Sequence, residues 1–209
     1  MAIARRKFMF AAAASALAPL GMKNMAWASA TVDAVKPVEA LHAALLEAMQ
    51  EGETLGFAGR LRKLQPILSQ VFDIAGMTKT AMGAAWTALP TTQQAAAVDV
   101  FGRYLATMYA SRFKSYSGQA FDTDKVTERG ADKAIVATSL SRPGKDPIVL
   151  DYLVRDEDGR WRIADIYLNG AISQLAQLRA EFGSPLRDGG FAALQTALEG
   201  KIKQLGGGA

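Results

Sequence analysis

The chain has 209 residues, half of them apolar, which is enough for one domain with a hydrophobic core. Its formal charge of +4 belongs to the first thirty residues, where four cations stand without an acid, and the remaining 20 cations balance 20 acids. This balance gives no basis for nucleic-acid binding, which requires a cationic patch in the folded part. Cysteine is absent, so disulfides, thiolate nucleophiles and a lipoprotein anchor are excluded.

Residues 1–30 have the three parts of a secretory signal peptide. Cations at 5–7 precede an apolar run over 8–22, and small residues precede two possible cleavage points, after Ala28 and after Ala30. The apolar run is shorter than the roughly twenty residues that span a bilayer. We therefore predict an exported protein of the bacterial periplasm, with the leader removed.

The export route has two interpretations. Arg5 and Arg6, followed after one residue by Phe8 and Met9, resemble a twin-arginine signal, and the same residues also suit a general secretory leader. Both routes end in the same compartment.

A linker is expected over residues 31–37, followed by a helix of about fifteen residues that ends near Gly52. His42, the only histidine, lies on this helix without a neighbouring acid, cysteine or serine motif. We interpret it as a packing or surface residue rather than a catalytic base. Residues 55–89 contain four glycines and one proline, which favours several short helices.

The longest helix is predicted to follow a cap at Thr91 or Thr92. Its apolar residues recur every three or four positions over more than five turns: Val98, Phe101, Leu105, Met108 or Tyr109, and Phe113. The far end is aromatic, with Tyr104, Tyr109, Phe113 and Tyr116. Such a stripe is more typical of a core than of a ligand site.

Beyond Gln119 the pattern predicts four strands joined by short turns, over 121–128, 134–140, 148–155 and 160–168. They form an antiparallel meander. Alternation places Tyr152 and Val154 on one face of the third strand. In the fourth, it places Trp161, Ile163, Asp165 and Tyr167 opposite Arg162, Ala164, Ile166 and Leu168.

Helical spacing returns at Ile172, Leu175, Leu178 and Phe182, and again from Phe191, with breaks expected at 184–185 and 188–190. The predicted fold class is α+β, with a four-stranded curved antiparallel sheet packed with several helices around an apolar pocket. Residues 31–205 form the single domain, and 206–209 are expected to be a disordered tail.

No motif for phosphate cradling, metal binding or nucleophilic catalysis occurs in the sequence. We predict no catalytic residues, no metal, no cofactor and no enzymatic activity. An apolar interior suits a lipid, because each buried methylene contributes roughly 0.8 kcal/mol.

Several segments resemble the toluene-tolerance or MlaC family of periplasmic phospholipid-binding proteins. The C-terminal signature of this family is similar to residues 161–167, 169–170, 178–182 and 189–194. The family's junction between the long helix and the first strand is similar to residues 109–116 with Phe121. The resemblance covers nearly the whole mature chain and is closest to the HpnM branch, which is associated with hopanoid biosynthesis. Ala171 and Ile172 depart mildly from the family pattern.

The resemblance implies a shuttle that carries lipid between an inner-membrane ABC-type transporter complex and an outer-membrane lipoprotein complex. The cargo is either a phospholipid or a hopanoid. The pocket would lie between the long helix and the sheet, so the implied lipid-binding residues are Phe101, Leu105, Met108, Tyr152, Val154, Ile163 and Leu175. Asp165 and Arg112 are expected to be structural polar residues that orient the sheet or the mouth.

Two alternatives remain. The first is an enzyme of the nuclear-transport-factor-two-like superfamily, which shares such a cone and would need His42 paired with Asp151 or Asp165. The second is a non-catalytic adaptor of a membrane complex, which predicts a filled core without a cavity.

Overall fold

The computed structural model describes residues 22–207, with side chains from Asp33 onward. The predicted leader, residues 1–30, and its two predicted cleavage points therefore lie outside the residues whose side chains are described. Within this range the helices are α1 (Met22–Gln50), α2 (Gly52–Val71), α3 (Ile74–Met82), α4 (Ala84–Thr87), α5 (Thr91–Arg112) and α6 (Gln174–Gly207). The strands are β1 (Ala120–Glu128), β2 (Lys133–Arg142), β3 (Lys145–Glu157), β4 (Arg160–Leu168) and β5 (Ile172–Ser173).

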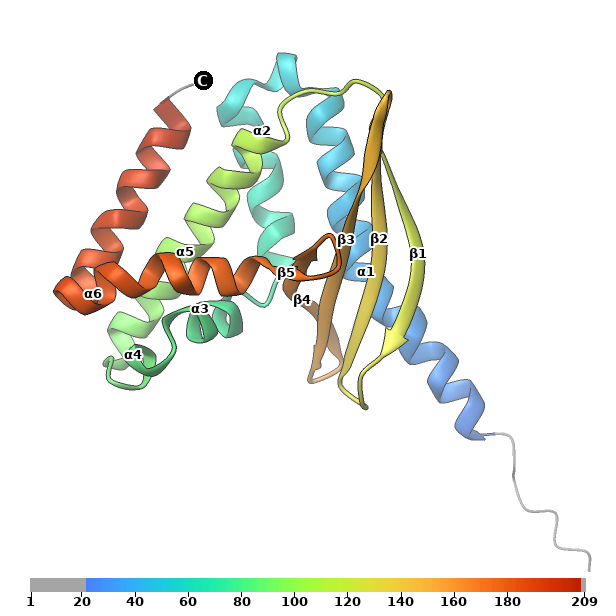
Figure 1. The fold of residues 1–209 in the computed structure, drawn as a ribbon, viewed down its shortest axis with the longest axis horizontal. Helices are drawn as coiled ribbons and strands as arrows, with labels where there is room; N and C mark the ends of the chain where they lie inside the picture. Colours follow the sequence, from blue (N-terminus) through green and yellow to red (C-terminus); the bar gives the residue numbers. More distant parts are fainter. Residues whose placement is uncertain (1–21, 208–209) are drawn as a thin grey trace, which may run out of the picture.

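The strands form one antiparallel sheet in chain order, and the helices lie on one of its faces (Figure 1). The predicted α+β class is confirmed, and so are the four predicted strands. β5 adds a short fifth strand where a helix was expected to begin. Asp158 and Gly159, both with positive φ, form the tight turn between β3 and β4, as in hairpins whose turn matches the strand twist.

The expected linker over residues 31–37 is wrong, because α1 runs through it and includes Pro37. Ala34 and Val38 are fully buried, and they continue the helical spacing of Leu41 and Leu45 back along the chain. This burial offsets the backbone hydrogen bond that a proline removes from a helix. α1 thereby contacts β1, β2, β3 and β4 and forms the floor of the core.

A β-bulge interrupts the alternation of β4. Ile163 pairs with Val154 and Asp165 pairs with Leu153, so Ala164 is an extra residue. Beyond the bulge Ile166 pairs with Tyr152, which faces the helices. The predicted faces of β4 are therefore wrong after Ile163: Ile166 joins the inner face.

α6 consists of two helical parts, 174–188 and 191–207, separated by non-helical backbone at Gly189 and Gly190. The predicted break at 188–190 is confirmed, whereas Pro185 lies inside the first part. The first part crosses in front of the helical layer and the second returns beside α5 (Figure 1). Gly206 and Gly207, expected in the tail, belong to the last turn of α6.

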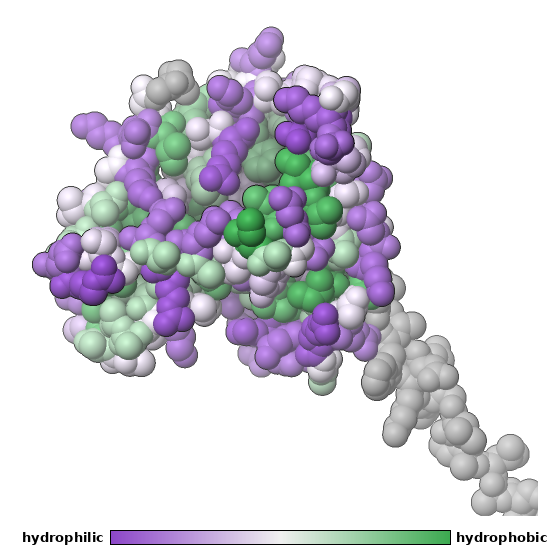
Figure 2. Space-filling model, in the orientation of Figure 1, coloured by the Kyte–Doolittle hydropathy of each residue, from purple (hydrophilic) through white to green (hydrophobic). Residues whose placement is uncertain are grey.

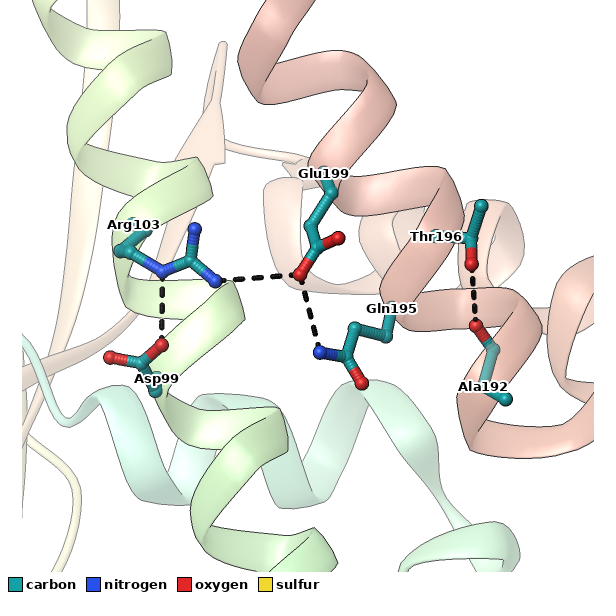
Figure 3. A network of polar contacts seen from close by, with 6 residues as sticks. All are labelled: Asp99, Arg103, Ala192, Gln195, Thr196 and Glu199. Carbon is teal, nitrogen blue, oxygen red and sulfur yellow. Dashed lines mark hydrogen bonds and ion pairs between the residues drawn. The ribbon is translucent and has the colours of Figure 1, made fainter.

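An exposed network joins the second part of α6 to α5 (Figure 3). Arg103 Nε donates to Asp99 Oδ2 at 2.9 Å, and a terminal guanidinium nitrogen of Arg103 lies 3.7 Å from Glu199 Oε1. Gln195 donates to the same Glu199 oxygen. Exposed ion pairs add little stability, so the buried Phe101, Leu194 and Leu198 supply most of this contact.

The Gly189–Gly190 break makes a prediction about stability. Gly190 has φ 64° and ψ −152°, a region that is essentially restricted to glycine. A Cβ there would meet no atom within 4 Å, so the cost of Gly190→Ala is backbone strain alone, about 1–3 kcal/mol of unfolding free energy. Gly200→Ala, in the regular helix and equally unobstructed, should instead stabilise by about 0.5–1 kcal/mol. Urea denaturation of both variants measures the difference, and equal effects would contradict the assignment.

Candidate functional site

A cavity of about 210 Å³ lies between the sheet, the end of α5 and the first part of α6. Its lining combines apolar and aromatic walls with a few polar side chains. The residues are Leu45, Phe72, Met77, Tyr104, Leu105, Met108, Tyr109, Arg112, Phe113, Leu150, Tyr152, Asp165, Ile166, Leu168, Gln174, Gln177, Leu178 and Glu181.

The aromatic end of α5 forms one wall of the cavity. The Tyr109 ring stacks on Phe113 at 5.5 Å between centroids and meets Phe72 edge-on at 5.8 Å. Burial raises the pKa of Tyr109 far above its usual range, and the nearby Arg112 charge opposes that rise. The wall is therefore a rigid apolar surface on which the Tyr109 phenol stays protonated.

His42 supports the opposite wall from α1. Its Nε2 lies 3.0 Å from the Tyr152 hydroxyl, and its ring stacks on Phe121 at 4.0 Å. Burial lowers the His42 pKa to about 4, so the imidazole is neutral at neutral pH. The pKa of Tyr152, like that of Tyr109, is raised, mainly by burial and then by the neighbouring Tyr109.

Asp165 fixes the start of α6 beside the cavity. Its Oδ1 accepts hydrogen bonds from the backbone N–H groups of Ile166 (2.7 Å) and Leu175 (3.0 Å), and its Oδ2 accepts one from the Ser173 hydroxyl (2.6 Å). Ser173 Oγ in turn accepts from Ala176 N–H. The two side chains thus cap the helix and satisfy amides that no helical carbonyl reaches.

The exposed polar side chains of the lining lie at the rim of the cavity. Arg112, Gln177 and Glu181 are exposed, whereas Tyr104, Leu105 and Tyr152 are buried. Glu181 forms an ion pair with Lys201 from the second part of α6. The cavity is therefore mainly apolar inside, where the one buried carboxylate, Asp165, is already hydrogen-bonded, and it is polar at its edge. This arrangement accommodates an amphiphile.

Comparison with known proteins identifies the family. The family model described as MlaC protein matches residues 39–200, most of the chain. The chain belongs to the MlaC family. No curated protein sequence matches it.

A solved structure shares the fold of this MlaC family member. It is a phospholipid-binding protein from Ralstonia solanacearum in complex with a phospholipid, with a TM-score of 0.70 and 23% sequence identity. The match covers 83% of this chain and 98% of that one. At this identity the likeness establishes the fold.

Three of the seven residues predicted to bind lipid line the cavity: Leu105, Met108 and Tyr152. The other four, Phe101, Val154, Ile163 and Leu175, are buried in the core outside the lining. Phe101 lies one turn before Leu105 and packs edge-on against Phe182 at 5.9 Å. Val154 and Ile163 pair with each other at the bulge, where Phe72 also bridges to Ile163.

Several lining residues, including Ile166, Leu168 and Leu178, were not among those predicted from the sequence. Ile166 and Leu168 were assigned to the face opposite Ile163, and the bulge at Ala164 brings Ile166 to the inner face. The sequence does carry a signal for Leu178, which follows Leu175 at helical spacing.

His42 forms its hydrogen bond with a phenol rather than a carboxylate, and Asp165 is engaged by three donors of its own. The pair required by the enzyme alternative is therefore absent from the hydrogen bonds of residues 33–207. Within the described part of the chain no group of three or more His, Cys, Asp or Glu residues is placed to hold a metal ion. Over the same part, no helix combines the length and apolar character needed to cross a membrane.

The buried His42 predicts a pH-dependent stability. The unfolded chain takes up a proton below about pH 6.5, whereas the folded chain takes it up only near pH 4. Stability is therefore lost as pH falls through this window, by on the order of 3 kcal/mol from this group. Urea denaturation between about pH 7 and pH 4 measures the unfolding free energy of both proteins. It should fall further in the wild type than in His42→Gln, because glutamine does not titrate in this range. Parallel pH profiles of the two proteins would contradict it.

The cap formed by Asp165 predicts a stability cost. Asp165→Ala leaves the N–H groups of Ile166 and Leu175 without their acceptor and should lower the unfolding free energy by about 1–3 kcal/mol. Asp165→Asn retains an acceptor and should cost less, and Asp122→Ala, at an exposed strand position, should be nearly neutral. Thermal denaturation ranks the three variants. An Asp165→Ala protein that keeps its stability and loses only lipid would contradict the structural role.

Proposed function

We propose that this MlaC family member is a periplasmic carrier that holds the apolar part of a lipid in the cavity between α5, the first part of α6 and the sheet. It transfers lipid between an inner-membrane transporter complex and an outer-membrane lipoprotein complex, and it catalyses no reaction. The observation that carries the proposal is the cavity itself, with apolar walls and a polar rim. The phospholipid bound by the structural neighbour from Ralstonia solanacearum supports the same class of ligand.

The cavity must widen to hold a diacyl lipid. Its volume of about 210 Å³ lies below the roughly 300–1,000 Å³ of pockets for drug-sized ligands. The first part of α6 is the element suited to move. It lies between the start that Asp165 caps and the Gly189–Gly190 break. Rotation of this segment about its capped start, with the break as the second hinge, would open the cavity while the sheet and α5 stay in place.

The same observations disfavour the two alternative functions, a membrane-complex adaptor and a cone enzyme. An adaptor was expected to have a filled core, and the cavity disfavours it. A cone enzyme was expected to pair His42 with a carboxylate, and His42 pairs with Tyr152. Both candidate ligands, a phospholipid and a hopanoid, would bury hydrocarbon against the apolar walls, and a phospholipid would in addition place a phosphate at the rim.

Two neighbouring residues of β3 provide a matched test. Leu150 lines the cavity, whereas Val149 is 43% exposed on the other face of the strand. Leu150→Trp should fill the cavity and weaken phospholipid binding about tenfold or more, a loss of roughly 1.4 kcal/mol or more. Val149→Trp should bind as the wild type does. Displacement of a fluorescent acyl probe measures both, with circular dichroism to show that each variant is folded.

Equal affinities for the folded Leu150→Trp and Val149→Trp proteins would contradict the assignment of the cavity. A wild-type protein that takes up no lipid under these conditions would contradict the carrier function as a whole.

A further inference from the structure

Among the described residues, Arg112 is the one charged side chain of the cavity lining that has neither an ion pair nor a hydrogen bond. The lining contains three charged groups of the described chain: Arg112, Asp165 and Glu181. Asp165 is engaged by two backbone amides and a hydroxyl, and Glu181 is paired with Lys201. None of the ion pairs formed among residues 33–207 involves Arg112. The lining therefore presents one positive charge that no described side chain engages.

The position of Arg112 places this charge where the polar part of a lipid would emerge. Arg112 is the last residue of α5 and is exposed, one turn after the buried Tyr109. Across the cavity, on the first part of α6, Gln177 is exposed and its side chain has no hydrogen-bond partner among the described residues. Apolar residues Met108 and Phe113 adjoin Arg112 on the same wall. Figure 2 shows apolar side chains reaching the surface around the start of α6, among polar ones.

We propose that Arg112 binds the phosphodiester of the lipid held in the cavity, with the Gln177 amide as a second donor, so that the protein selects phosphate-bearing lipids over neutral ones. This inference rests on the proposed function, since the acyl chains must occupy the cavity for the head to reach the rim. A guanidinium offers two parallel N–H donors that match a phosphate, and such charge-assisted bonds are stronger than neutral ones. A neutral lipid of the same chain length gains the apolar contacts without this bond.

The test compares two lipids that share their acyl chains: dioleoyl phosphatidylglycerol and dioleoylglycerol. Affinities for the full mature protein, Arg112→Gln and Lys114→Gln are measured by displacement of a fluorescent acyl probe. Lys114 is an exposed cation two residues away that does not line the cavity, so its variant controls for net charge. We expect Arg112→Gln to lose about tenfold in affinity for the phospholipid and to keep its affinity for dioleoylglycerol. Lys114→Gln should change neither affinity by more than a small factor.

The outcomes separate this inference from the proposed function. If the wild type binds both lipids with equal affinity and Arg112→Gln leaves these affinities unchanged, the headgroup site is overturned and the proposed carrier function still stands. Equal losses for both lipids in Arg112→Gln would also overturn it, since they would mean that Arg112 only stabilises the end of α5 through the helix dipole. A wild type that binds neither lipid would instead contradict the carrier.

A binding experiment with inorganic phosphate tests whether Arg112 binds the phosphate of a lipid headgroup or free phosphate. We expect no saturable binding of phosphate alone to the lipid-free protein, because one exposed arginine gains enough affinity only when acyl chains hold the head beside it. Saturable phosphate binding that Arg112→Gln abolishes would assign Arg112 to a free anion and overturn the lipid headgroup site.

Discussion

The carboxylate of Asp165 connects the sheet to the helix that covers the cavity. It is placed by the β-bulge at Ala164, and from there it accepts hydrogen bonds from Leu175 and Ser173 at the start of α6. The same bulge returns Ile166 to the inner face, where it lines the cavity. One extra residue in β4 therefore sets both where the covering helix begins and which side chains form the wall beneath it.

This arrangement gives the protein a well-packed frame and a helix that covers the cavity. α1, α2 and the sheet bury Leu41, Leu64 and Val154 completely, and His42 adds a buried hydrogen bond to Tyr152. The first part of α6 is held at its start by its cap, and the glycine break separates its end from the second part. In the proposed carrier the frame would keep the apolar walls in place while the covering helix admits and releases the lipid.

The sequence predicts the frame well and the cavity only in part. Strand positions follow from alternation and turn residues, and α5 follows from its long helical period. The bulge at Ala164 has no such signal, so the later residues of β4 were assigned to the wrong faces. Phe101 and Leu105 are both apolar residues of α5, and nothing in the sequence distinguishes them. Only the packed structure shows that Phe101 lies in the core and Leu105 in the cavity wall. Residues 31–37 were expected to be a linker, and they are helical because Ala34 and Val38 are buried on the face that Leu41 and Leu45 continue.

Native mass spectrometry of the protein purified from the cells that make it, followed by extraction of any bound molecule, tests the carrier function most directly. We expect one phosphate-bearing diacyl lipid per chain, lost in Leu150→Trp and kept in Val149→Trp. A polycyclic triterpenoid in its place would keep the carrier and remove the phosphate site at Arg112. A protein that carries no lipid, and takes up none when phospholipid is supplied, would contradict the central claim.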